Sequence, residues 1–105
     1  MARYFLAYMG TGGEMAPTPE EQQKVMAAWG AWMGGLGERL VDPGAPVMPQ
    51  SSVTSSGTAQ GTQSGFGGWS VVTADDLEGA IAATKGCPHL DTGGTIEVFQ
   101  VIEMQ

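Results

Sequence analysis

Apolar residues recur along the chain at spacings that predict strands and helices. Residues 3–9 (RYFLAYM) form a short, aromatic-rich run that is apolar on both faces of an extended strand. One face would carry Tyr4, Leu6 and Tyr8, and the other Phe5, Ala7 and Met9. A strand of this kind needs a helix over one face and further cover, such as a second subunit, over the other.

A helix is predicted to begin at Thr18, because Thr18 suits the N-cap, Pro19 the first helical position and Glu21 the capping box. Its apolar residues follow at the three- and four-residue spacing of one buried stripe. They are Val25, Trp29, Trp32, Met33, Leu36 and Leu40.

Four glycines interrupt this helical pattern, at positions 30, 34, 35 and 37. An interior glycine costs a helix about 1 kcal/mol relative to alanine, so a close contact should offset the cost. We expect the close approach of another backbone, or of the Trp29 and Trp32 rings. A ligand resting on the helix would produce the same pattern.

The middle of the chain is irregular. Residues 10–16 are predicted to be a flexible loop. Residues 40–48 read as a strand broken at Pro43-Gly44 and restricted to an edge by Pro46. Residues 50–65, rich in Ser, Thr, Gln and Gly, are predicted to form a long hairpin or flexible flap whose ends pair as strands.

The C-terminal part predicts a strand, a short helix and a final strand. Residues 69–73 form an apolar strand that should lie centrally, and Asp75 is expected to cap the helix that follows. Gly86 suits the left-handed position after the helix, and Pro88 prevents its continuation. Residues 95–103 alternate as a last strand, with Ile96, Val98 and Ile102 predicted to point inward.

The predicted order is strand, helix, strand, strand, helix, strand. This order favours a single α+β domain over residues 1–105, with a ferredoxin-like βαββαβ antiparallel sheet and both helices on one face. The second face would expose Phe5, Met9 and Phe99, so we expect a homodimer that packs sheet to sheet.

Charge and cysteine content exclude several classes of partner. The formal net charge is −7, and the four cations Arg3, Lys24, Arg39 and Lys85 are scattered, which disfavours nucleic acid and anionic membrane surfaces. Cys87 is the single cysteine and cannot form an internal disulfide. No apolar run approaches the roughly 20 residues that span a bilayer. We therefore expect a soluble, cytoplasmic protein.

Few residues offer catalytic chemistry. His89 is the only imidazole, and a general base formed with Asp91 competes with a plain role in the turn after the helix. Cys87 follows a helix C-terminus, which disfavours a thiolate, so a buried structural thiol is the favoured interpretation. Asp42 is a candidate acid–base group in a cleft, or simply a turn-forming residue beside Pro43-Gly44.

Binding motifs are equally sparse. The glycine-rich pieces at 10–13 and 65–68 match no phosphate-binding fingerprint, and no cofactor is predicted. The His, Cys and carboxylate residues lack metal-ligand spacing, so no metal site is predicted. Tyr8 and Trp32 are the candidate ligand-binding residues, since aromatic side chains line apolar pockets, although such residues also build cores. The other aromatic candidates are Tyr4, Trp29 and Trp69.

Several motifs together resemble the YCII-related (DGPF-type) family. They are Gly67-Gly68-Trp69, the run from Asp75 to Ala80, Gly86-Cys87-Pro88, Gly93-Gly94 and Ile96-Glu97-Val98, with Leu40 to Gly44 compatible. The resemblance implies a dimeric α+β barrel of ferredoxin-like topology. Some members carry a His–Asp pair suggested to be catalytic. Asp42 matches that Asp, but no His lies between Thr18 and Leu40, and the Asp-Gly-Pro-Phe motif is absent.

Two functions follow as hypotheses. The first is a small-molecule enzyme or binder that uses a cleft at the sheet and dimer interface, lined by Asp42, Tyr8 and Trp32. The second is a non-catalytic accessory or regulatory module that contacts another protein through its acidic surface and the flap at 50–65. A pocket with converging polar groups would favour the first hypothesis.

Overall fold

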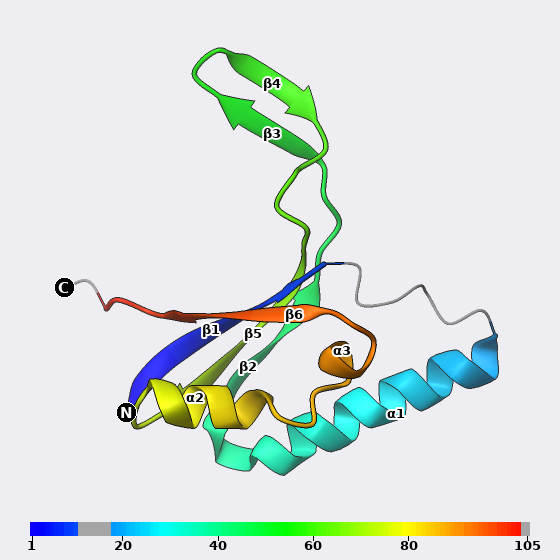
Figure 1. Ribbon diagram of the computed structural model, residues 1–105, viewed down its shortest axis with the longest axis vertical. Coiled ribbons are helices and arrows are strands. Elements are labelled where there is room, and N and C mark those ends of the chain that lie inside the picture. Colours follow the sequence, from blue (N-terminus) through cyan, green and yellow to red (C-terminus); the bar gives the residue numbers. More distant parts are fainter. Residues whose placement is uncertain (11–17, 104–105) are drawn as a thin grey trace.

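The chain folds around one antiparallel sheet of four strands. A computed structural model describes residues 1–10 and 18–103. The strands β1 (Ala2–Met9), β2 (Leu40–Pro46), β5 (Phe66–Ala74) and β6 (Thr95–Gln100) lie in the order β2-β5-β1-β6 (Figure 1). With the helices α1 (Pro19–Leu36) and α2 (Leu77–Thr84), this confirms the ferredoxin-like topology.

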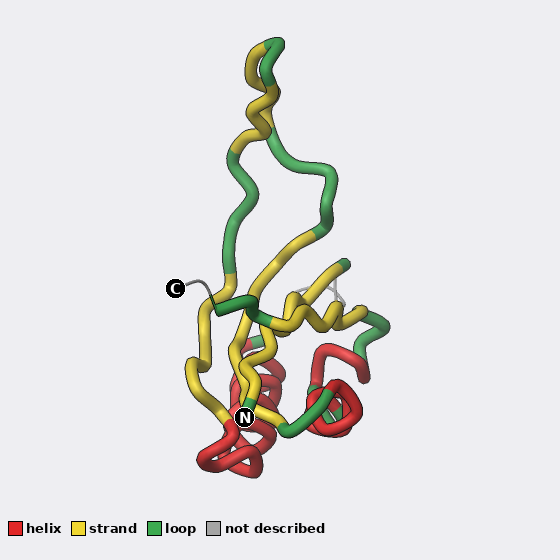
Figure 2. The backbone as a smooth tube through the Cα atoms, turned by 90° about the vertical axis from the view of Figure 1, so that its left-hand side faces the viewer, coloured by secondary structure: helices red, strands yellow, loops and turns green. Residues whose placement is uncertain are grey.

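A hairpin stands apart from this sheet. The strands β3 (Ser51–Thr54) and β4 (Gly57–Gln60) pair only with each other, from Ser51 opposite Gln60 to Thr54 opposite Gly57. Residues 47–65, here called the arm, carry this hairpin away from the helices in both views (Figures 1 and 2). Strand pairing within the predicted flap is therefore confirmed, and its flexibility stays a prediction.

The core lies between the helices and one face of the sheet. The pairing of Tyr4 with Val72 and of Leu6 with Ser70 places these side chains on the same face. Against them pack Trp32 and Leu36 of α1, Ala80 and Ala83 of α2, and Cys87. The alternation of strand residues predicted this face, and burial of its apolar side chains is the main favourable contribution to folding.

The opposite face of the sheet carries an aromatic cluster. Phe5 stacks on Trp69 and Phe66, with ring centroids 5.8 and 6.1 Å apart, and meets Phe99 at 6.3 Å. We call these four residues the aromatic face. No helix of the described chain covers it, and Phe99 is 50% exposed. The sequence prediction of an apolar open face is therefore confirmed.

Helix α1 begins at the predicted residue, but its glycines do not make the predicted contacts. The Thr18 hydroxyl accepts a hydrogen bond from the Glu21 amide at 3.1 Å, and the helix ends before Gly37, whose φ is 58°. Side chains added at Gly30, Gly34 or Gly35 would meet nothing within 4 Å. The predicted close contact at these positions is wrong, because this face of α1 points away from the sheet.

Three local predictions in the C-terminal part need correction. Asp76, rather than Asp75, caps α2, since its Oδ1 accepts from the Gly79 amide at 2.8 Å. Pro88 does not lead into a simple turn but starts the one-turn helix α3 (Pro88–Asp91), because proline suits a first helical position. Ile102 lies beyond β6 and is 83% exposed, whereas Ile96 and Val98 pack on the core as predicted.

The remaining features of the fold concern the ends of the helices and the loop after β1. Gly86 has a φ of 84°, as its position after α2 predicts, and η1 (Gly37–Arg39) joins α1 to β2. The loop predicted over residues 10–16 falls, except for Gly10, outside the described residues. Over the described ranges, no helix is long and apolar enough to cross a membrane.

Candidate functional site

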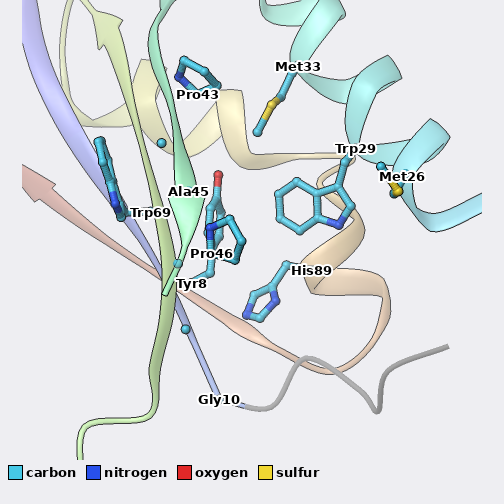
Figure 3. Close-up of a pocket in the computed structure, with 13 residues that line it drawn as sticks. Tyr8, Gly10, Met26, Trp29, Met33, Pro43, Ala45, Pro46, Trp69 and His89 are labelled. Atoms are coloured by element: carbon cyan, nitrogen blue, oxygen red, sulfur yellow. The ribbon is translucent and has the colours of Figure 1, made fainter. Parts of the chain in front are cut away.

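A pocket of about 580 Å³ opens between α1 and the end of the sheet from which the arm leaves. Helix α1 contributes Met26, Trp29 and Met33, and α3 contributes His89. Figure 3 shows Trp29 directed across the pocket toward Tyr8 and Pro46, with His89 to one side. A volume of this size suits a small organic ligand, for which typical pockets are roughly 300 to 1,000 Å³.

The wall opposite α1 consists of residues 43–46 of β2 and 67–69 of β5. Gly44 has a φ of 70°, and a Cβ there would overlap the Trp69 carbonyl. At Gly68 a Cβ would lie only 3.3 Å from the Ala45 oxygen and the Tyr8 ring. These glycines let β2 and β5 approach each other closely along this wall.

Tyr8 anchors the polar side of the pocket. Its hydroxyl donates to Ser70 Oγ at 2.7 Å, and Ser70 in turn donates to the Pro43 carbonyl at 2.7 Å. Burial raises the pKa of Tyr8 to about 12, more than the Ser70 hydrogen bond lowers it. The phenol is therefore protonated at neutral pH, and its oxygen keeps acceptor capacity for a bound molecule.

His89 is held by three elements at once. Its Nε2 lies 2.8 Å from the Met9 carbonyl, and its ring lies 5.6 Å from that of Tyr8. A carbonyl only accepts, so Nε2 must donate, and the neutral imidazole then carries its lone pair on Nδ1. Gly94 packs close to the same nitrogen, because a Cβ there would overlap Nε2 and the two ring carbons beside it. The structure thus selects one tautomer and one orientation of the ring.

Cys87 lies beneath the pocket in the core. Its side chain is 0% exposed and forms no disulfide. Burial raises the pKa of its thiol to about 11, an effect that the backbone amide of His89 opposes only in part. A thiol protonated at neutral pH and closed to solvent is a poor nucleophile, which agrees with the structural role inferred from its sequence position.

Of the four candidate site residues predicted from the sequence, two line the pocket and two do not. Tyr8 and His89 line the pocket together. Trp32 is buried beside it, and its indole N–H donates to the Ala83 carbonyl at 3.0 Å. Asp42 is exposed, and its Oδ1 accepts from the Gly44 amide at 2.8 Å in a tight turn. Neither Trp32 nor Asp42 belongs to the pocket lining.

The pocket offers little charge. Among the described lining residues none is Asp, Glu, Lys or Arg, and His89 is the one imidazole. No cluster of three or more His, Cys, Asp or Glu side chains that could hold a metal ion occurs within residues 1–10 and 18–103. The chemistry available here is hydrogen bonding, aromatic contact and proton transfer at an imidazole.

Sequence reasoning found part of this lining. It named Trp29 and Trp69 among the aromatic candidates, and both line the pocket, but it assigned no role there to Met26 or Met33. Trp29 meets the Tyr8 ring edge to face at 5.1 Å, and it shared the apolar stripe with Trp32. The stripe alone does not separate a residue that faces α2 from one that faces the pocket. The β2 wall had a detectable signal, because Pro43-Gly44 and Pro46 already marked a distorted edge strand.

Comparison with known proteins decides the family. The profile of the YCII-related domain matches residues 3–105. The chain belongs to the YCII-related domain family. Within this YCII-related chain, the segment from Gly86 to Val98 that carried the resemblance also places His89 and Gly94 beside the pocket.

One solved structure supports the same fold. It is 5-chloro-2-hydroxyhydroquinone dehydrochlorinase (TftG) from Burkholderia phenoliruptrix AC1100, in complex with 2,5-dihydroxybenzoquinone. The two chains align with a TM-score of 0.55 and 17% sequence identity, over 96% of this chain and 95% of that one. No curated protein matched this YCII-related chain.

Proposed function

We propose that this YCII-related protein is a homodimeric small-molecule binder or enzyme whose ligand is a small, uncharged molecule with an aromatic or similarly flat ring. The observation that carries the proposal is the pocket of about 580 Å³ between α1 and the sheet. Two aromatic rings, Trp29 and Tyr8, meet edge to face in its lining, with centroids 5.1 Å apart. A flat ring packs well against an aromatic surface of this kind.

Electrostatics support an uncharged ligand. The pocket lining holds no carboxylate and no Lys or Arg side chain among the residues described, and the chain as a whole has a formal net charge of −7. An anion would lack a partner in the pocket and would approach an acidic protein. The Tyr8 oxygen and His89 are the groups available to hydrogen-bond a hydroxyl or carbonyl on the ring.

In an enzymatic role, His89 would handle the proton. Its Nδ1 lone pair is available as a base because Nε2 is committed to the Met9 carbonyl. Tyr8 would position the ligand and keep its own proton, since its pKa is about 12. Asp42, the residue that matches the family's catalytic Asp, forms the turn at Gly44, and its participation stays a prediction.

Binding is tested with ring compounds of similar size and different charge. Hydroquinone is the neutral first probe. Benzoate and 2,5-dihydroxybenzoquinone, a vinylogous acid that is ionised at neutral pH, serve as the anions, the second because TftG was solved with it. We expect hydroquinone to raise the melting temperature and quench tryptophan fluorescence, and benzoate to do neither. Trp29→Ala should weaken hydroquinone binding about tenfold, and Tyr8→Phe less.

Gln23→Ala provides the matched control, because residue 23 lies on the exposed side of the same helix. Equal loss of binding in Trp29→Ala and Gln23→Ala would contradict the assignment of the pocket. If no ring compound stabilises the protein, the competing role as a non-catalytic interaction module becomes the better explanation.

The homodimer in this proposal rests on the aromatic face. An exposed apolar patch on a small protein commonly marks an interface, and a two-fold interface buries the same patch on both copies. The cytoplasmic location expected from the sequence stays a prediction, which fractionation of cells expressing the protein can test.

A further inference from the structure

The arm differs in composition from the rest of the molecule. Between Asp42 and Asp75 the chain contains no Asp, Glu, Lys or Arg, and every charged residue lies outside this stretch. The body therefore carries the whole formal net charge of −7. A surface without charge is the part of an acidic protein that approaches another acidic surface with the least repulsion.

The arm is also an ordered structure. Its strands pair in register from Ser51 opposite Gln60 to Thr54 opposite Gly57. Ser52 Oγ donates to the Gly61 carbonyl at 2.8 Å, and the Gly61 amide donates to the Gln50 carbonyl at 2.8 Å. A hairpin whose two strands are already paired loses less conformational entropy on binding than a loose loop does.

The exposed apolar side chains of the arm are not covered by the rest of the described chain. Met48 is 78% exposed and Val53 is 76% exposed, and the described residues of β4 are exposed throughout. Figures 1 and 2 show the hairpin leading away from α1 and α2, so it does not fold back over these helices. An isolated two-stranded hairpin is only marginally stable in water, so a contact elsewhere would stabilise this one.

The base of the arm adjoins the aromatic face. The arm ends where β5 begins at Phe66, and the Phe66 ring stacks on Phe5 at 6.1 Å. On the other side, the Val47 amide donates to the Gly67 carbonyl at 3.1 Å, which fixes the direction of departure. A second copy packed on the aromatic face would therefore lie next to the point where the arm leaves the sheet.

We propose that the arm is a self-association element: the arm of one copy packs against the body of a second copy of this chain, with Val53 as its anchor near the tip. This inference rests on the homodimer proposed above. The charge pattern favours a second acidic copy over nucleic acid or an anionic membrane, since either of these would require cations that the arm lacks.

The first test removes the arm. In one variant Gly-Asn-Gly replaces residues 49–64, which keeps Pro46 and Phe66 in the sheet, retains Val47 beside Gly67 and allows a tight turn. We expect sedimentation analysis to show a dimer for the wild-type chain and a dissociation constant at least about tenfold higher for the armless variant. Circular dichroism and cooperative thermal unfolding report that the armless body still folds.

The second test keeps the hairpin and adds one charge. Val53→Asp should weaken the dimer about tenfold, and added salt should partly restore it, because an acidic tip would meet an acidic body. Leu77→Asp, which places the same change on an exposed residue in the first turn of α2, is the matched control and should leave the dimer unchanged.

The outcomes separate the two proposals. A wild-type chain that is monomeric at micromolar concentration would overturn the homodimer and the arm contact together. A wild-type dimer that the armless and Val53→Asp variants reproduce with equal affinity would overturn the arm contact alone, and would leave the arm to a different partner.

Discussion

His89 owes its position to the absence of a side chain five residues later. The Gly94 amide donates to the His89 carbonyl at 3.0 Å, and the space where a Gly94 Cβ would lie is filled by the imidazole. The same ring reaches the Met9 carbonyl, 80 residues away in the sequence. One neighbouring and one distant segment therefore set the orientation of the only imidazole in the sequence.

Gly94→Ala should displace the His89 ring. We expect a loss of about 1 to 3 kcal/mol in the free energy of unfolding, because the added methyl overpacks a filled site. The imidazole resonances should shift as the hydrogen bond to Met9 breaks, which NMR of the single histidine can follow. Unchanged resonances together with unchanged stability would contradict the packing described for Gly94.

At the residue scale, the sequence predicted individual candidate groups better than it predicted which of them lie next to one another. Tyr8 and His89 were recognisable as an aromatic residue on a strand and a lone imidazole, but only strand pairing brings them together. Asp42 had the right residue type for a catalytic role, and its hydrogen bond to the Gly44 amide is the alternative that turn chemistry offered. Trp32 and Trp29 shared one stripe, and α2 covers only Trp32.

At the scale of elements, α1 is notable for interior glycines that lower its helical stability. Gly30, Gly34 and Gly35 lie in its second half, exposed, with open space where side chains would stand. Interior glycines cost helix stability because they lose more backbone entropy on folding than other residues do. No contact at these glycines within the described part of the chain offsets that cost.

Alanine at these positions should therefore stabilise the protein. We expect Gly34→Ala and Gly35→Ala each to raise the free energy of unfolding by about 0.5 to 1 kcal/mol, measured by urea denaturation. Gly37→Ala is the contrasting variant: its φ of 58° disfavours a side chain, so it should lose stability. Destabilisation at Gly34 or Gly35 would show that another molecule packs on this face of α1.

The sequence predicted the ends of helices well where they depend on neighbouring residues. The Thr18 cap and the left-handed Gly86 were foreseeable because capping depends on neighbouring residues. Adjacent Asp75 and Asp76 gave nearly the same signal, and the backbone conformation at Asp76 decided between them. The helical turn at Pro88 was hidden because four residues carry no periodicity.

The whole molecule presents one covered and one open side of its sheet. The order of strands and helices was sufficient to predict this arrangement, since short antiparallel connections leave few topologies. The pocket was not predictable in the same way, because its walls come from β1, β2, β5, α1 and α3 together. Its shape depends on distances between elements, which sequence patterns do not contain.

Phe99→Glu should disrupt the association of two copies. Phe99 is half exposed, so the change should cost the folded monomer little, but it places a carboxylate in the aromatic face that a two-fold dimer buries. Light scattering at micromolar concentration should show a monomer. Gln100→Glu adds the same charge at the next position of β6 and should remain dimeric; equal behaviour of the two variants would remove the aromatic face as the interface.

The uncharged stretch between Asp42 and Asp75 also governs how the protein can be cut. Trypsin cleaves after Lys and Arg, and the chain offers it no site between Arg39 and Lys85. Residues 40–85, which include the whole arm and the pocket wall formed by β2 and β5, are therefore released as one peptide. A photo-cross-link from the arm to a second copy would appear as that peptide joined to another, and peptide mass would identify the surface that the arm touches.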